Sequence, residues 1–304
     1  MFFNAFKKDK KSAVKKETES DSNGKEVVIG QKSSNSVSGT DFLRMYAEQY
    51  APYTLKDHVI KERSYDEIPL IDEKHPQLQS VAHRIESMRS QDPMIGAKMA
   101  SQEIYMNITN MLKDDKGVHA ETLLAALASI GGRACVQGVM NTLENMVSAD
   151  SPDKKKLIYS LATILSIYIC ETKSGDAYIL GDRIGNEFTI FYKNALAGKG
   201  DVQDLVPISR KTAELAGSEE RYWETPFDEI IKLSPQKFAD SFNNVFEITF
   251  KTYCRFPQER MLAVAFAAQK AVRELTDNHI MELEKAASII AEYGWRTSHY
   301  WGKL

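Results

Sequence analysis

The sequence predicts a mainly α-helical (α+β) protein, with a body of about eight helices and one β-hairpin behind a disordered N-terminal tail. Three observations support this fold class. Capping side chains stand directly before proline at four points, apolar residues recur at helical spacing through the C-terminal part, and one stretch combines β-forming residues with a turn. No second long polar stretch interrupts residues 41–304, so we expect one mostly helical domain there.

Residues 1–40 are rich in Lys, Ser, Asn and Gly and cannot bury enough apolar surface to offset the entropy lost on ordering. We therefore expect a disordered, solvated tail. An alternative is peripheral contact with an anionic membrane, in which rings insert and lysines meet lipid headgroups. The residues concerned are Phe2, Phe3, Phe6, Lys7, Lys8, Lys10 and Lys11. The segment is short and has no acylation site, which favours the solvated tail.

Helix starts are the clearest local signals. The four pairs of a capping residue and proline are Asp92-Pro93, Ser151-Pro152, Thr225-Pro226 and Ser234-Pro235. After Ser234, aromatic residues recur at steps of four, four, four and three, which predicts one buried helix face. These residues are Phe238, Phe242, Phe246, Phe250 and Tyr253. Two further periodic segments follow, so the last 70 residues predict three consecutive helices with antiparallel neighbours.

Upstream, residues 94–112 and 119–147 also have helical periodicity. The second segment is rich in Ala, Ser and Gly and includes the pair Gly131-Gly132, which predicts a central helix that neighbouring backbones approach closely. The β-hairpin is predicted around residues 167–180, with its turn at Ser174-Gly175. Residues 157–165 are open to two interpretations, the start of the first strand or the end of the preceding helix.

Composition excludes several function classes. The 39 basic and 42 acidic side chains leave a formal charge of -3, which disfavours a dedicated nucleic-acid-binding protein. Three cysteines without a C-x-x-C pair exclude a disulfide scaffold and a cysteine-rich zinc site. No secretory signal is visible, and neither residues 157–170 nor 123–140 form a long enough charge-free membrane span. We expect a cytoplasmic protein in which both segments are buried.

His119-Ala120-Glu121 is the first candidate site, because zinc deaminases place a metal-binding His and a general acid/base Glu in an H-x-E segment. Those enzymes also need a downstream P-C-x-x-C, which this chain does not contain. The structural interpretation is therefore favoured. In it, Glu121 is stabilised by the helix dipole and His119 lies at or before the helix cap.

Asp182 is the second candidate, since carboxylates at strand ends often belong to binding sites. Glu171 and Asp176 are close in sequence, but no D-x-D-x-D spacing supports a cation loop. We favour a structural role for Asp182, capping a helix that begins at Ile184 or Asn186. Arg255-Phe256-Pro257 is interpreted as a turn between helices rather than a site, and the aromatic C-terminus as packing on the body.

No catalytic, metal-binding or cofactor-binding motif is complete. The chain has no G-x-S-x-G elbow, no H-E-x-x-H helix, no paired histidines and no phosphate-binding glycine loop. The sequence therefore predicts no catalytic residue, no metal and no cofactor.

Three stretches resemble a family of uncharacterised bacterial proteins: HAETLLAALASIGGRACVQGVM (residues 119–140), SGDAYILGD (174–182) and FPQERMLAVAFAAQKAV (256–272). In that family a His-x-Glu-Thr-Leu-Leu-Ala-Ala-Leu helix precedes a strand pair that ends in Gly-Asp. The resemblance covers about half of the body and implies a role for His119, Glu121 and Asp182. It implies no activity, substrate or cofactor.

The leading functional hypothesis is a non-catalytic protein that binds a protein partner or forms homo-oligomers. The incomplete motifs and the small-residue and aromatic helix faces motivate it. The competing hypothesis is a small-molecule-binding or metal-binding protein, or an enzyme, with a pocket where His119, Glu121 and Asp182 converge.

Overall fold

The computed structural model describes residues 76–145, 147, 153–171, 175–197, 205–215 and 221–303. Nine α-helices and two small sheets lie within these ranges, which confirms the mainly α-helical fold class. The helices are α2 (Pro76–Met88), α3 (Ile95–Leu112), α4 (Ala120–Asn145), α5 (Lys154–Ile164), α6 (Asp182–Ala195), α7 (Val206–Leu215), α8 (Pro235–Tyr253), α9 (Pro257–Asp277) and α10 (Leu283–Ser298). The predicted tail, its membrane contact and the Ser151-Pro152 helix start lie outside the described residues.

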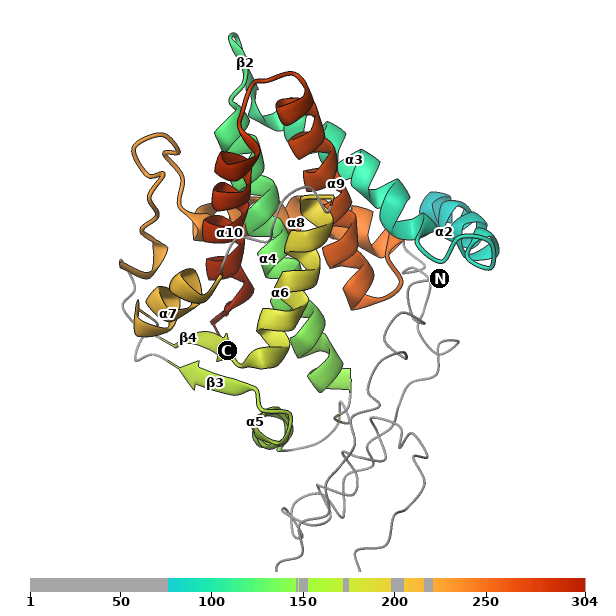
Figure 1. The fold of residues 1–304 in the computed structure, drawn as a ribbon. Helices are drawn as coiled ribbons and strands as arrows, with labels where there is room; N and C mark the ends of the chain where they lie inside the picture. Colours follow the sequence, from blue (N-terminus) through green and yellow to red (C-terminus); the bar gives the residue numbers. More distant parts are fainter. Residues whose placement is uncertain are drawn as a thin grey trace, which may run out of the picture. The chain divides into compact units, whose positions relative to one another are not determined.

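The small-residue helix α4 is central, as predicted: it packs against α10, α9, α8 and α6 (Figure 1). A side chain on Gly131 would run into the ring of Phe191, and one on Gly132 would meet the backbone of Gly294 in α10. Among the described helices, α4 is long and apolar enough to cross a membrane, yet 89% of that apolar window is buried inside the fold. This burial is typical of the core helix of a soluble protein.

The three C-terminal helices α8, α9 and α10 confirm the predicted helical stretch. Ser234 is the N-cap of α8 and its hydroxyl accepts a hydrogen bond from the Lys237 N–H, while Pro235 is the first helical residue. The four phenylalanines of the predicted stripe are buried, and Tyr253 is half-buried. Phe238, Phe242 and Phe246 stack in succession along the helix. The stripe therefore faces the core.

Two predicted helix starts differ from the structure. Thr225-Pro226 begins a turn that ends before Ile231, because the Thr225 hydroxyl accepts from the Phe227 N–H and bonds to Asp228 across a tight local loop. At Asp92-Pro93, the helix α3 begins only at Ile95, two positions after the proline. The Asp92 carboxylate accepts a hydrogen bond from the Met94 N–H before the helix begins. In both places the side chain satisfies a local turn instead of the first turn of a helix.

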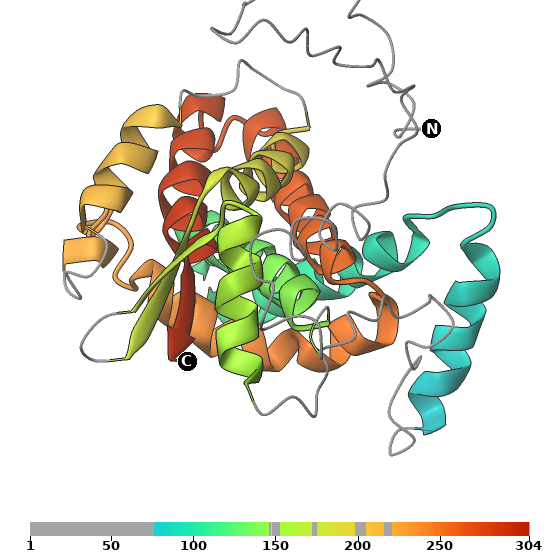
Figure 2. The same ribbon diagram turned by 90° about the horizontal axis from the view of Figure 1, so that it is seen from below.

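The predicted hairpin is present as β3 (Tyr168–Glu171) and β4 (Asp176–Leu180), paired antiparallel. Residues 157–165, for which the sequence allows either a strand start or a helix end, belong to α5 and the turn after it. The sequence did not predict a third strand, β5 (Tyr300–Lys303), which pairs antiparallel with β4 and gives the sheet order β3-β4-β5 (Figure 2). A small hairpin, β1 (Lys113–Asp114) with β2 (Gly117–Val118), was also not predicted and directly precedes α4.

Strand β5 explains how the aromatic C-terminus packs. Tyr300 is buried and its hydroxyl donates to Asp176 on β4 at 2.9 Å. Arg133 of α4 donates to the Tyr300 carbonyl at 2.6 Å and lies over the Tyr300 ring. Trp223, from the short helix η2 (Arg221–Trp223), meets the same ring edge-on. The predicted packing of these aromatics on the body is therefore confirmed.

Candidate functional site

The first candidate pair, His119 and Glu121, lies at the start of α4. His119 directly precedes the helix, its carbonyl accepts from the Leu123 N–H, and its Nδ1 lies 2.7 Å from the Thr122 hydroxyl. His119 Nε2 is 3.4 Å from Glu121 Oε2, and Lys285 Nζ is 2.6 Å from the other carboxylate oxygen. The structure thus brings His119 and Glu121 together at the helix cap, as the structural interpretation expected.

Electrostatics at this cap favour a charged, structural carboxylate. Burial is the largest single influence on the Glu121 carboxyl and disfavours its charged form, but the hydrogen bonds from Lys285 and from the Glu121 backbone, together with the nearby positive charge, outweigh it and lower the pKa. The His119 side chain is 53% exposed. This ion pair ties the start of α4 to the start of α10.

The second candidate, Asp182, lies elsewhere. It is the first residue of α6, so the helix begins at Asp182 itself rather than at Ile184 or Asn186. Gly181 occupies the N-cap position with φ +126°, a conformation that favours glycine. The Asp182 carboxylate is thus a first-turn acid near the helix dipole and not the cap.

Asp182 does not converge with His119 and Glu121. Glu121 is bonded to Lys285 in the first turn of α10, whereas Asp182 shares a cleft with Trp295 and His299 at the opposite end of α10. Trp295 lies ten positions after Lys285 in the same helix, which at a rise of 1.5 Å per residue corresponds to about 15 Å. The predicted pocket made by all three residues is therefore absent from the described part of the chain.

A cleft of about 490 Å³ lies where Asp182 is found. Its walls come from the end of β4, the first turns of α6, the helix α7 and the end of α10. The lining residues are Leu180, Gly181, Asp182, Gly185, Asn186, Thr189, Leu205, Val206, Ser209, Thr212, Ala213, Trp295 and His299. This volume and the mixture of apolar walls with a few polar groups are typical of small-molecule sites.

His299 is the most distinctive residue of the cleft, and no sequence motif singled it out. Only 5% of the residue is exposed, and its ring lies over the Trp295 ring with centroids 4.7 Å apart. His299 Nδ1 is 2.9 Å from the Trp295 carbonyl oxygen and 2.9 Å from the Ser298 hydroxyl. Because a carbonyl only accepts, Nδ1 carries the proton and Nε2 keeps a lone pair.

The protonation state of His299 follows from its burial. Removal from water disfavours the imidazolium and lowers the pKa of His299 to about 4, although the bond to the Trp295 carbonyl opposes this shift. The ring is therefore neutral at pH 7. Among the described residues no hydrogen bond is made to Nε2, so this atom is left to accept one from a bound molecule.

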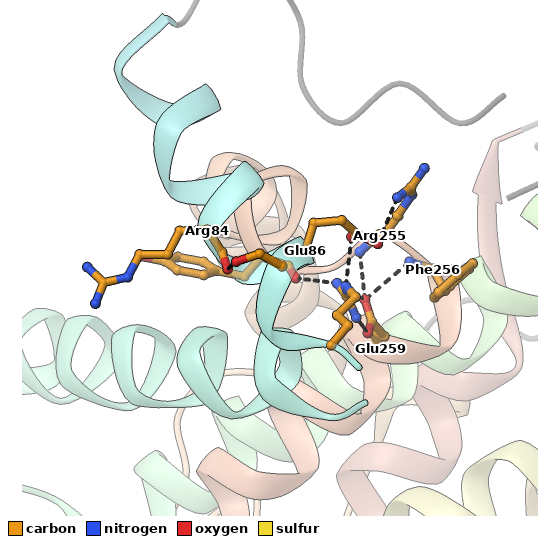
Figure 3. Close-up of polar contacts among 8 residues, drawn as sticks. Arg84, Glu86, Arg255, Phe256 and Glu259 are labelled. Atoms are coloured by element: carbon orange, nitrogen blue, oxygen red, sulfur yellow. Dashed lines mark hydrogen bonds and ion pairs between the residues drawn. The ribbon is translucent and has the colours of Figure 1, made fainter. Parts of the chain in front are cut away.

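A second polar cluster joins the α2–α3 turn to the α8–α9 turn (Figure 3). The buried Glu259 carboxylate accepts from the side chain of Arg89 and from the backbone N–H groups of Arg255 and Phe256. Arg255 also pairs with Glu86 at 3.0 Å. The sequence interpretation of this stretch as a turn is correct, but it missed the cluster because the Arg89–Glu259 pair spans 170 positions. Its ion pairs join two turns, which indicates a structural role.

The described residues contain no group of three or more His, Cys, Asp or Glu side chains placed to hold a metal ion. Comparisons with known proteins found no matching family model, no matching curated protein and no matching solved structure. The function is therefore argued from the cleft.

Proposed function

We propose that the protein binds a small organic molecule in the cleft between α6, α7 and α10. The observation that carries this proposal is the neutral His299, a buried imidazole in the cleft wall whose Nδ1 is already bonded and whose Nε2 can accept a hydrogen bond. A hydroxyl or N–H group of a ligand can donate to this atom. This proposal keeps Asp182 from the sequence hypothesis and leaves out His119 and Glu121.

The arrangement supports binding more directly than catalysis. The polar side chains of Thr189 and Thr212 already donate to carbonyls within their own helices. No hydrogen bond joins a cleft hydroxyl to His299 within the described lining, as a nucleophile–base pair would require. Apolar side chains such as Leu205 and Trp295 make up much of the remaining wall.

Native mass spectrometry of full-length protein purified from its own host tests the proposal. The wild-type protein is expected to retain a bound small molecule. Ser209→Trp, which fills the cleft from α7, is expected to lose it, while Lys211→Trp on the exposed part of the same helix keeps it. An empty wild-type protein, or equal retention by both variants with intact circular dichroism, contradicts the proposal.

A second proposal is the interaction with a protein partner or with a second copy of the chain. It is supported by exposed apolar side chains on α3 and α8, Met99, Met106, Val245 and Ile248. Glu103 of α3 bonds to Thr249 of α8, so these two helices lie side by side. The same mass spectra test it: a retained protein partner or homo-oligomer that Met106→Lys abolishes supports the interaction, and a monomer without a partner contradicts it.

A further inference from the structure

The ionisable groups of the cleft wall are few and of one sign. Among the described lining residues, Asp182 is the one carboxylate and none is a lysine or an arginine. The N-terminus of α6 contributes roughly half a positive charge, which offsets only part of the carboxylate charge. The cleft wall around Asp182 therefore carries a net negative charge. This charge disfavours carboxylate or phosphate ligands and favours a cation.

A second lining residue, His299, offers a hydrogen-bond acceptor. With its proton held on Nδ1 by the Trp295 carbonyl, His299 can present only a lone pair at Nε2. A hydroxyl or N–H group of a ligand can donate a hydrogen bond to Nε2. A ligand group that only accepts, such as a carboxylate, cannot bond to this atom. Trp295 and Leu205 provide apolar surface in the same cleft.

Asp182 and His299 are within reach of one small molecule. The Ile179 N–H donates to the His299 carbonyl at 2.7 Å, which places these two backbones next to each other. Asp182 follows Ile179 by three residues, at most about 10 Å of extended chain. The Cα atoms of His299 and Asp182 are therefore within about 15 Å, and their side chains share one cleft.

From these features we infer that the ligand is a small organic amine, with its protonated nitrogen at Asp182, an apolar middle, and a hydroxyl or N–H donor at His299. This inference rests on the proposed small-molecule function and names the ligand class. It predicts selection for a positive charge at Asp182 and for a hydrogen-bond donor at His299.

Three probes that share one ring and one two-carbon chain test it: tyramine, 3-(4-hydroxyphenyl)propionate and phenethylamine. Binding to the full chain is measured by ligand-observed saturation-transfer NMR with titration. Tyramine is expected to bind at least about tenfold more tightly than the propionate, because the charge at the Asp182 end is reversed. Phenethylamine, which lacks the hydroxyl, is expected to bind about threefold to tenfold more weakly than tyramine.

Two variants test whether Asp182 causes the preference for a positively charged ligand. Asp182→Asn is expected to weaken tyramine binding about threefold to fivefold and to leave the propionate unchanged or tighter. Glu284→Gln is the matched control, since Glu284 is an exposed acid in the first turn of α10 and lies outside the cleft. It is expected to change neither affinity.

The outcomes separate the amine inference from the proposed function. Propionate binding that equals or exceeds tyramine binding, and that Ser209→Trp abolishes, overturns the amine inference and keeps the cleft. Saturable binding of none of the three probes at millimolar concentration also overturns the amine inference. The fate of the cleft proposal is then decided by the molecule that native mass spectrometry finds or fails to find.

Discussion

Replacing Gly132 by alanine tests the packing on which the whole body depends. A Cβ on Gly132 would lie 2.9 Å from the Gly294 carbonyl carbon and closer still to its oxygen, whereas ordinary contacts begin near 3.4 Å. Helices α4 and α10 must therefore separate by at least half an ångström. Overpacking a core costs about 1–3 kcal/mol, and here the obstacle is backbone that cannot rotate away, so we expect the upper part of that range.

The higher helix propensity of alanine offsets only part of this overpacking cost. Alanine is favoured over glycine inside a helix by about 1 kcal/mol, which leaves a net loss of about 2 kcal/mol in the free energy of unfolding. For a chain of this size that loss corresponds to a fall of about 4–8 °C in the melting temperature. Gly185→Ala is the matched control, because its Cβ would meet the Trp295 ring at an ordinary 3.5 Å.

The assay is thermal and urea unfolding followed by circular dichroism at 222 nm. Gly132→Ala is expected to melt lower than the wild type, and Gly185→Ala to melt at the same temperature or slightly higher. If Gly132→Ala is as stable as the wild type, α4 and α10 do not approach each other as closely as described, and the reasoning is refuted.

Three further predictions concern charged, titrating and reactive side chains. Glu259→Gln is expected to cost about 3–5 kcal/mol in urea unfolding because it removes the buried carboxylate that pairs with Arg89 and accepts from two backbone N–H groups; the more exposed Glu247→Gln should cost less than about 1 kcal/mol, and equal losses would argue against a buried network. The depressed pKa of His299 means that the unfolded chain binds the proton more tightly, so stability is retained above pH 6.5 and falls by about 3 kcal/mol towards pH 4. His299→Gln should flatten this slope; a slope equal to that of the wild type in denaturation at several pH values would exclude His299 as the cause. Cys170 is exposed and the other two cysteines are buried, so Ellman's reagent should titrate one thiol rapidly in the native protein and three after unfolding; rapid reaction of all three in the native protein would be inconsistent with the core.

Local chemistry determined most of the secondary structure. The Ser234-Pro235 start of α8 and the phenylalanine stripe behind it are predictable because the cap and the periodicity act within one or two turns. The hairpin before Asp182 is predictable for the same reason, with β-forming residues on both sides of a glycine at φ +86°. Thr225-Pro226 shows that such local signals can also predict a helix wrongly. Its hydroxyl makes the kind of bond found at a helix cap, but here the bond closes a turn.

The candidate site was predicted only in part. Asp182 stood out as a carboxylate after a strand, and it does line the cleft. His119 and Glu121 carried a motif-like spacing, but their contacts are those of a helix cap. His299 carried no sequence signal, because a single histidine beside aromatic residues does not reveal whether its ring is buried or exposed.

The sequence by itself determined the helical fold class, the close-packed small-residue helix and the positions of most helices, because capping and periodicity are local. Only the tertiary structure decided that β5 completes the sheet, that Glu259 meets Arg89, and that the two ends of α10 separate Glu121 from Asp182. It also decided that His299 is neutral. These features depend on which distant residues exclude water from one another, and desolvation is a property of the packed chain rather than of any short segment.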